Sequence, residues 1–208
     1  QAGISVTACD KAPRTAFGAL ADELESMGAV LHLGDAYLDG LDQDVIFRSP
    51  GIRPDIPPFL SAMEKGSALT SEMEVFFQVC PCKIIAVTGS DGKTTTTTLI
   101  AEMLKNAGYT VHLGGNIGKP LLSEAGSISP DDIAVLELSS FQLMTLSASP
   151  DIAVFTNLSP NHLDIHKSME EYALAKENIF SHQGENDLAI FNRDNDLTHA
   201  MVCRAPGR

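Results

Sequence analysis

Short apolar runs alternate along the chain with longer stretches of helical spacing, and this alternation predicts a parallel sheet covered by helices. In the first third of the chain, the expected strands cover residues 5–9, 29–33 and 45–49. The expected helices of this part cover residues 15–28 and 55–66, with a loop at residues 34–44. Prolines in the first turn of the second helix and a glycine near its end fit those bounds.

A second series of strands and helices begins at Lys83. Its expected strands cover residues 83–89, 110–115, 132–140, 151–159 and 187–192. Its expected helices run from Thr94 to Ala107 and from Met169 to Phe180. We place a domain boundary within residues 70–83, which gives one α/β domain over residues 1–72 and another over residues 73–208.

The composition restricts the partners of the chain. A hydrophobic fraction of 44% over 208 residues is typical of a packed protein, and the formal net charge is -13. Because nucleic acids and anionic membranes would be repelled by that charge, we expect neither as a partner, and any phosphate must be bound locally. The scattered cysteines Cys9, Cys80, Cys82 and Cys203 are interpreted as reduced thiols. Without a long apolar run, we expect no membrane insertion and a cytoplasmic protein.

The stretch Gly89-Ser90-Asp91-Gly92-Lys93-Thr94 lies between an expected strand and an expected helix. In that setting, backbone N–H groups and the helix N-terminus converge on one point and form an anion site. Lys93 can reach terminal phosphates, and the hydroxyl of Thr94, or else of Thr95, can bind Mg²⁺. The strict Walker pattern requires a glycine where this chain has Val87. The alternative is a simple glycine turn with a capping threonine and a solvated lysine.

Glu137 lies within the apolar run "IAVLELSSF", where a charge is costly unless it is paired or binds a cation. If the strand ends near Leu138, Glu137 lies at its carboxyl end, which is where open α/β sheets bind ligands. A strand-end glutamate in solvent is an equally good interpretation of the position alone.

The segment after the expected strand 151–159 contains several polar residues that could carry chemistry: Asn157, His162, Asp164, His166 and Lys176. A histidine just beyond a strand can ligate a metal, although a single histidine is more often structural or exposed. Lys176 lies at the edge of an apolar helical face, where a lysine usually extends its charge into solvent.

Five motifs in order resemble those of the Mur ligases, the ATP-dependent ligases of peptidoglycan synthesis, and within them the members that add D-glutamate. They are "SPGI" (49–52), "VTGSDGKTTTT" (87–97), "GGNIGKPL" (114–121), "LELSSFQL" (136–143) and "NLSPNHLDIHKSMEEYALAK" (157–176). Among these motifs "LELSSFQL" is the most discriminating, because other Mur ligases and the folylpolyglutamate synthases resemble this chain chiefly at the phosphate loop and around the histidine.

The resemblance implies a two-step reaction. ATP phosphorylates the carboxylate of UDP-N-acetylmuramoyl-L-alanine, and the amine of D-glutamate then attacks the acyl phosphate. The carboxylate needs this activation because its oxygen is otherwise a poor leaving group, and two metal ions would neutralise the phosphate charge. The resemblance also implies that residues 1–72 are part of a Rossmann-like domain that binds the UDP-substrate. Residues 73–208 would then be part of a P-loop-type central ATP-binding domain.

Residue by residue, the resemblance implies three catalytic side chains, Lys93, His162 and Lys176. It assigns ATP to Gly89, Ser90, Asp91, Gly92, Lys93, Thr94 and Thr95. It assigns one Mg²⁺ to Thr94 with Glu137, and a second to His162 with a carbamylated Lys176. It assigns binding of the UDP-substrate to Asp10, Lys11, Ser49, Asn116, Ser139 and Gln142.

Two positions depart from the family pattern, with Asp91 in place of a frequent asparagine and Asn161 in place of a frequent aspartate. The resemblance further implies that the chain is an internal piece of a longer protein. It would lack the first strand, the end of the ATP domain and the C-terminal domain, and be inactive alone. Three other hypotheses remain: another Mur-type ligase, a P-loop kinase or nucleotide switch, and a non-catalytic module that binds nucleotide or UDP-sugar.

Overall fold

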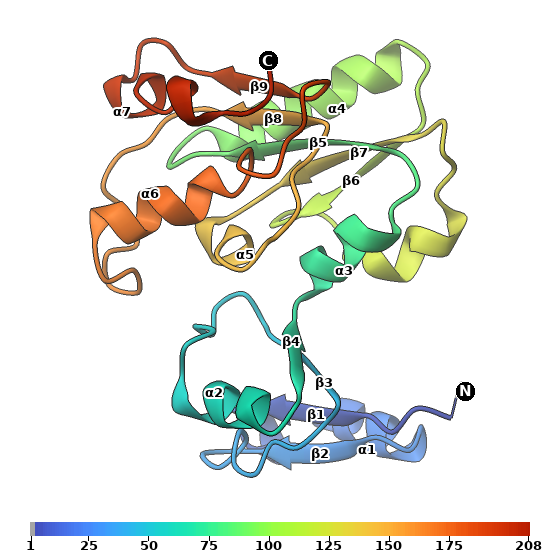
Figure 1. The fold of residues 1–208 in the computed structure, drawn as a ribbon. Coiled ribbons are helices and arrows are strands. Elements are labelled where there is room, and N and C mark those ends of the chain that lie inside the picture. Colours follow the sequence, from blue (N-terminus) through green and yellow to red (C-terminus); the bar gives the residue numbers. More distant parts are fainter. Residues whose placement is uncertain (1–2) are drawn as a thin grey trace. The chain divides into compact units, whose positions relative to one another are not determined.

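The structure, a computed structural model, describes residues 3–208. Its internal contacts divide the chain into two compact units. The first contains the residues up to Ile46 together with Pro54–Leu69, and the second contains Phe47–Arg53 together with Thr70–Arg208. The short segment Phe47–Arg53 therefore belongs to the second unit, although the residues on either side of it in the chain belong to the first (Figure 1).

The first unit follows the expected order of elements. Strand β1 (Thr7–Asp10) and strand β2 (Val30–Leu33) are parallel and are joined through helix α1 (Ala19–Ser26). Strand β3 (Val45–Phe47) pairs with strand β4 (Ala68–Thr70), and helix α2 (Pro57–Glu64) lies between them in sequence. The three predicted strands, the two helices and the loop at 34–44 are confirmed with shorter bounds, whereas β4 was not predicted.

The second unit is built on a five-stranded sheet with the order β6-β7-β5-β8-β9, and every neighbouring pair is parallel (Figure 1). The strands are β5 (Lys83–Thr88), β6 (Val111–Gly115), β7 (Ile133–Glu137), β8 (Ile152–Phe155) and β9 (Leu188–Phe191). All five were predicted from their apolar runs. Because the strands are parallel, their carboxyl ends share one edge of the sheet.

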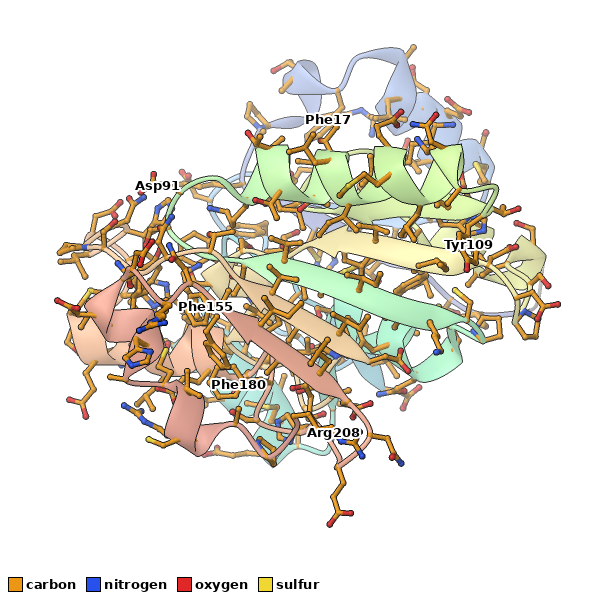
Figure 2. The ribbon with its side chains drawn as sticks, turned by 90° about the horizontal axis from the view of Figure 1, so that it is seen from above. Phe17, Asp91, Tyr109, Phe155, Phe180 and Arg208 are labelled. Carbon is orange, nitrogen blue, oxygen red and sulfur yellow. The ribbon has the colours of Figure 1, made fainter. Side chains whose placement is uncertain are left out.

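Helices cover both faces of this sheet. They are α3 (Glu72–Val79), α4 (Lys93–Asn106), α5 (Ser140–Leu143), α6 (Met169–Glu177) and α7 (Asp196–His199). Short 3-10 turns occur at Arg14–Ala16, Leu122–Ser127 and Val202–Arg204. Helix α4 was predicted within one residue at each end, and α6 ends at Glu177 rather than at Phe180. In Figure 2, α4 lies along one face of the sheet, above the strands in that view.

The alternation of side chains along the strands divides the core into two layers. Ile84 and Ala86 of β5 face a large apolar cluster formed with α3, α5 and α6, which includes Phe76 and Phe180. Ile85, one residue along, faces α4 in a separate cluster. Both faces of the central strand are thus buried, which holds its carboxyl end in a fixed position. Within residues 3–208, no helix has both the length and the apolar character needed to cross a bilayer.

Candidate active site

The loop Gly89–Gly92 connects β5 to α4 at the carboxyl end of the central strand, and Figure 2 shows Asp91 at this turn. Gly89 has φ +149°, and a Cβ atom there would lie 1.9 Å from Oγ1 of Thr156. Gly92 has φ +74° and forms the N-cap of α4. The two glycines therefore let the backbone turn closely against β8 and enter the helix, as the phosphate-loop prediction requires.

Residues that follow β8 brace this loop. Asn157 accepts a 2.9 Å hydrogen bond from the Asp91 amide at its side-chain oxygen and another of 2.9 Å from the Ser90 amide at its carbonyl. Its Nδ2 donates to the Asp91 carbonyl at 3.0 Å, and Thr156 Oγ1 donates to the same carbonyl at 2.7 Å. The loop is therefore held in one conformation by the residues that follow β8, which reduces the cost of ordering it around a ligand.

The predicted nucleotide-binding side chains differ in what they offer. Nζ of Lys93 donates to the carbonyls of Gly89 (3.0 Å) and Ser90 (2.9 Å), so its charge lies over the loop. The hydroxyl of Ser90 is buried and is hydrogen-bonded to Ser159, so this side chain holds the loop. Thr95 is exposed on α4.

Glu137 is 2% exposed at the end of β7. Its two carboxylate oxygens accept hydrogen bonds from different segments, one from Thr94 Oγ1 at 2.6 Å and one from Asn116 Nδ2 at 2.8 Å. The interpretation of Glu137 as a strand-end residue in solvent is therefore wrong. An anionic carboxylate and a hydroxyl are hard oxygen donors, and their contact beside the phosphate loop fits one Mg²⁺.

Lys176 of α6 is 1% exposed, so the interpretation that it extends into solvent is wrong. Its Nζ donates to the Gly89 carbonyl at 2.9 Å and to Thr88 Oγ1 at 3.2 Å, and it lies 4.9 Å from the centre of the Tyr172 ring. The pKa of Lys176 is lowered to about 7, mainly by burial and secondly by the charge of Lys93. The structure thus places the predicted lysine directly behind the phosphate loop.

The two histidines have different environments. His166 is buried, its Nε2 lies 2.9 Å from Ser140 Oγ, and its ring stacks on Phe141 with a centroid distance of 5.2 Å. Burial lowers the pKa of His166, which favours the neutral ring. The contact with Ser140 connects the segment before α6 to α5. His162 is exposed, has φ +54°, and lies 5.3 Å from Phe141 between ring centroids.

A second metal site is not assembled by these side chains. Over residues 3–208, no group of three or more His, Cys, Asp or Glu side chains is arranged to hold a metal ion. His162 and Lys176 both lie near Tyr172, whose ring centroid is 6.3 Å from that of His162 and 4.9 Å from Nζ of Lys176. An unmodified lysine is a cation and cannot ligate Mg²⁺. The pairing of His162 with Lys176 on a metal therefore stays a prediction.

Two of the predicted substrate residues, Asn116 and Gln142, line a pocket of about 320 Å³ beside the end of β7. The pocket is lined by Pro50, Ser71, Glu72, Met73, Gly115, Asn116, Ile117, Gly118, Pro120 and Gln142. Ser139 is the N-cap of α5 and forms a reciprocal capping box with Gln142, which fixes the side chain that reaches the pocket. Ser49, the neighbour of Pro50, is exposed.

The remaining substrate candidates belong to the first unit. Asp10 ends β1, and Lys11 follows it; both side chains are exposed. Oδ1 of Asp10 accepts a 2.7 Å hydrogen bond from the Ala12 amide, which shapes the turn after the strand. Their assignment to the UDP-substrate stays a prediction.

Sequence reasoning missed several residues that build the site. Thr88 receives a hydrogen bond from Lys176, and Tyr172 lies 3.2 Å from Ser90 Oγ through its hydroxyl. Helical spacing assigned Tyr172 only to an apolar face. Arg48 is 3% exposed, and its position at the end of an expected strand gave no reason to expect burial. Its side chain binds the residues that follow it, a contact without a sequence signature.

Comparisons with known proteins identify the family of the chain. The family profile described as "Mur ligase middle domain" matches residues 87–206. UDP-N-acetylmuramoylalanine–D-glutamate ligase of Clostridium kluyveri is 55% identical over 207 residues, which is 99% of this chain and 45% of that protein. The ligase of the same name from Clostridium botulinum (strain Okra) is 54% identical over 206 residues, again 99% of this chain and 45% of that protein. The chain therefore spans about half the length of these relatives.

Solved structures show the same fold. A UDP-N-acetylmuramate:L-alanyl-gamma-D-glutamyl-meso-diaminopimelate ligase from Neisseria meningitides matches with a TM-score of 0.61 and 19% identity. The match covers 100% of this chain and 70% of the other. The MurF ligase of Thermotoga maritima, solved in complex with ADP, matches with a TM-score of 0.51 and 23% identity over 80% of this chain and 49% of the other. The profile of the Mur ligase middle domain covers more than half of the residues of this chain. The chain therefore belongs to the Mur ligases.

Proposed function

We propose that this chain forms the nucleotide-binding region and part of the substrate-binding region of a ligase that joins D-glutamate to UDP-N-acetylmuramoyl-L-alanine at the expense of ATP. The identity of 55% to the Clostridium kluyveri ligase supports the choice of substrates. The contact of Thr94 with Glu137 beside the Lys93 loop carries the chemical part of the proposal. It combines a phosphate cradle with hard oxygen donors at the end of a central strand.

In this function, Lys93 and the backbone amides at the start of α4 bind the phosphates of ATP and orient the terminal one toward the substrate carboxylate. Thr94 and Glu137 hold Mg²⁺, which neutralises charge on the phosphates. Transfer of the terminal phosphate makes an acyl phosphate, the amine of D-glutamate forms the amide bond, and inorganic phosphate leaves. We infer that His162 and a carbamylated Lys176 bind a second Mg²⁺, because a carbamate would replace the ammonium with an anionic oxygen ligand.

We also infer that the first unit is part of a Rossmann-like domain, with Asp10 and Lys11 near the uracil and Ser49 near the diphosphate. Asn116, Ser139 and Gln142 would contact the substrate near its reacting carboxylate. The pocket at Asn116 and Gln142 supports this assignment, since its polar groups are held by Glu137 and by the capping box. The second unit would be of the P-loop type, and the use of ATP would place the reaction in the cytoplasm.

A P-loop kinase or a nucleotide switch would share the phosphate loop with a ligase. Neither gives a role to Lys176, which lies buried against Gly89, or to the capping box of Ser139 and Gln142. A kinase would release a stable phosphorylated product. A ligase would release phosphate only when the acceptor amino acid is present.

The test is detection of the product by mass spectrometry with Mg-ATP, bicarbonate, UDP-N-acetylmuramoyl-L-alanine and either D- or L-glutamate. Two proteins are compared: this chain, and this chain completed with the flanking segments of the Clostridium kluyveri relative. A D-glutamate adduct from the completed protein alone supports the ligase and makes this chain an inactive part of it. A phosphorylated product that is stable without glutamate supports the kinase. Absence of any adduct from a folded completed protein refutes the proposed function.

A further inference from the structure

Arg48 is a buried arginine that the proposed chemistry does not use. It immediately precedes residues 49–52, here called the 49–52 segment. This segment includes the predicted substrate residue Ser49. Nη1 of Arg48 donates to the carbonyls of Ile52 at 2.7 Å and Pro50 at 3.1 Å. Nη2 donates to the carbonyl of Phe141 at 3.1 Å and to Thr145 Oγ1 at 3.2 Å. One guanidinium thus ties the segment to helix α5 and to the residues just after it.

A second arginine holds the other end of the segment. Nη1 and Nη2 of Arg53 bind the two carboxylate oxygens of Glu171 at 3.1 and 2.8 Å. Nη1 also donates to the Ile165 carbonyl at 2.9 Å. Glu171 is itself fixed by a 2.6 Å hydrogen bond from the Lys167 amide. The segment is therefore held at both ends, through Arg48 by α5 and the residue Thr145 that follows it, and through Arg53 by residues before and within α6.

One of these attachment points, Phe141, lies next to a residue that lines the pocket. Phe141 lies between Ser140 and Gln142 in α5, so the Arg48 bond to its carbonyl fixes the distance from the segment to the Gln142 side chain. Pro50 and Gln142 both line the pocket, together with Asn116, which binds Glu137. A displacement of the segment would change the width of the pocket without touching the phosphate loop.

We propose that Arg48 and Arg53 are positioning residues that hold the 49–52 segment on the nucleotide-binding unit, so that the UDP-substrate is bound in register with the reacting phosphate. This role rests on the proposed function. It requires arginine, because a planar guanidinium can bind carbonyls of two segments at once, whereas a lysine ammonium is a single point of contact. The hydrogen bonds to backbone carbonyls keep the buried charge of Arg48 satisfied.

Hydrogen exchange of this chain, measured by mass spectrometry, tests the attachment. The Ile52 amide, which donates to the Ser49 carbonyl at 3.0 Å, reports on the segment. In Arg48→Met we expect it to exchange about tenfold faster, with α4 unchanged. Arg14→Met is the matched control, because Arg14 makes exposed ion pairs with Asp22 and Glu25. Unchanged exchange at Ile52 would overturn the attachment. Arg48→Lys, which keeps the charge, serves as the second variant if Arg48→Met does not fold.

Steady-state kinetics of the completed ligase test the positioning role. We expect Arg48→Lys and Arg53→Lys to raise the KM for the UDP-substrate about tenfold, with the KM for ATP unchanged. A uniform loss of kcat with both KM values unchanged would indicate a merely structural role and overturn the proposal. If the wild-type completed protein forms no D-glutamate adduct, the proposed function fails, while the exchange result still decides whether the arginines hold the segment.

Discussion

The hydroxyl of Thr94 donates a 2.6 Å hydrogen bond to Glu137, and this contact joins the first turn of α4 to the end of β7. It brings together two residues that are distant in sequence, one from the phosphate loop and one from an apolar strand. Asn116 binds the second oxygen of the same carboxylate at 2.8 Å. Glu137 therefore connects the first turn of α4 to Asn116, which lines the pocket beside the end of β7.

Replacing Glu137 with Gln should weaken the binding of Mg-ATP without unfolding the chain. The glutamine oxygen can accept from Asn116, and its NH₂ group can donate to Thr94 Oγ1, so both hydrogen bonds are kept while the charge is lost. We expect the affinity for Mg-ATP to fall about 10- to 100-fold, with the affinity for ATP in EDTA unchanged. Titration calorimetry measures both. Glu102→Gln is the control, since Glu102 is an exposed residue paired with Lys105 on α4. An equal loss of ATP affinity with and without Mg²⁺ would argue against a role of Glu137 in binding the metal.

The order of the elements could be predicted because each depends on local patterns. Apolar runs marked all five strands of the large sheet, and the glycines and Lys93 marked the loop before α4. Helix α3 was missed although Ser71 and Glu74 form the start signal of a helix, with the Ser71 side chain accepting from the Glu74 amide. The segment was assigned to the domain boundary instead, because a second series of strands and helices begins at Lys83.

The burial of particular polar residues could not be predicted. Lys176 binds the carbonyl of Gly89, which is 87 residues away in sequence, and periodicity places it only at the edge of a face. His162 and His166 looked equivalent as sequence, yet one is exposed and the other is stacked on Phe141. Long-range packing decides such cases, and helical spacing carries no information about it.

The two loop glycines should differ strongly when each is replaced by alanine. In Gly89→Ala the new Cβ would lie 1.9 Å from Thr156 Oγ1 and 3.0 Å from the Asn157 carbonyl, so the brace would have to move. A Cβ atom at Gly92 would have nothing within 4 Å, so the only cost of Gly92→Ala is that alanine must adopt a left-handed backbone conformation. We expect the free energy of unfolding to fall by about 1 kcal/mol in Gly92→Ala and by about 3 kcal/mol or more in Gly89→Ala. Urea unfolding at neutral pH measures both, and equal values would show that the brace is not rigid.

The ion pair of Glu171 with Arg53 should make stability depend on pH in the acid range. Hydrogen bonds from Arg53 and then from the Lys167 amide lower the pKa of Glu171 from 4.5 to about 2. Because the folded state has the lower pKa, this contribution is fully present above about pH 4.5 and is lost as pH falls toward 2.

Glu171→Gln should therefore lower the free energy of unfolding by about 1–2 kcal/mol at pH 7, a figure reduced for solvent screening of a partly exposed pair. The difference from wild type should shrink as the pH falls from 4.5 to 2. Urea unfolding of both proteins at pH 7 and pH 3 measures this, with Glu170→Gln on the exposed side of the same helix turn as control. A difference that stays constant with pH would mean that the loss comes from packing rather than from the charge.

Lys176→Ala should abolish ligation by the completed ligase while leaving the protein folded. If the carbamate of Lys176 is an anionic metal ligand, removing the side chain removes that oxygen donor and leaves space behind the Gly89 carbonyl. Small carboxylates such as formate or acetate should then restore part of the activity, because they can place an oxygen in the same space. Product formation, measured over a series of formate concentrations, gives the rescue.

Lys105→Ala is the matched control, because Lys105 is an exposed lysine on α4 whose Nζ binds Glu102 at 2.8 Å. It should retain full activity and show no response to formate. A Lys176→Ala protein that loses activity and is not rescued would support a purely packing role for the buried lysine, since its side chain also contacts Thr88 and the Tyr172 ring. Full activity without rescue would remove Lys176 from the reaction altogether, and the ligands of the second Mg²⁺ would then have to be sought elsewhere in the ligase.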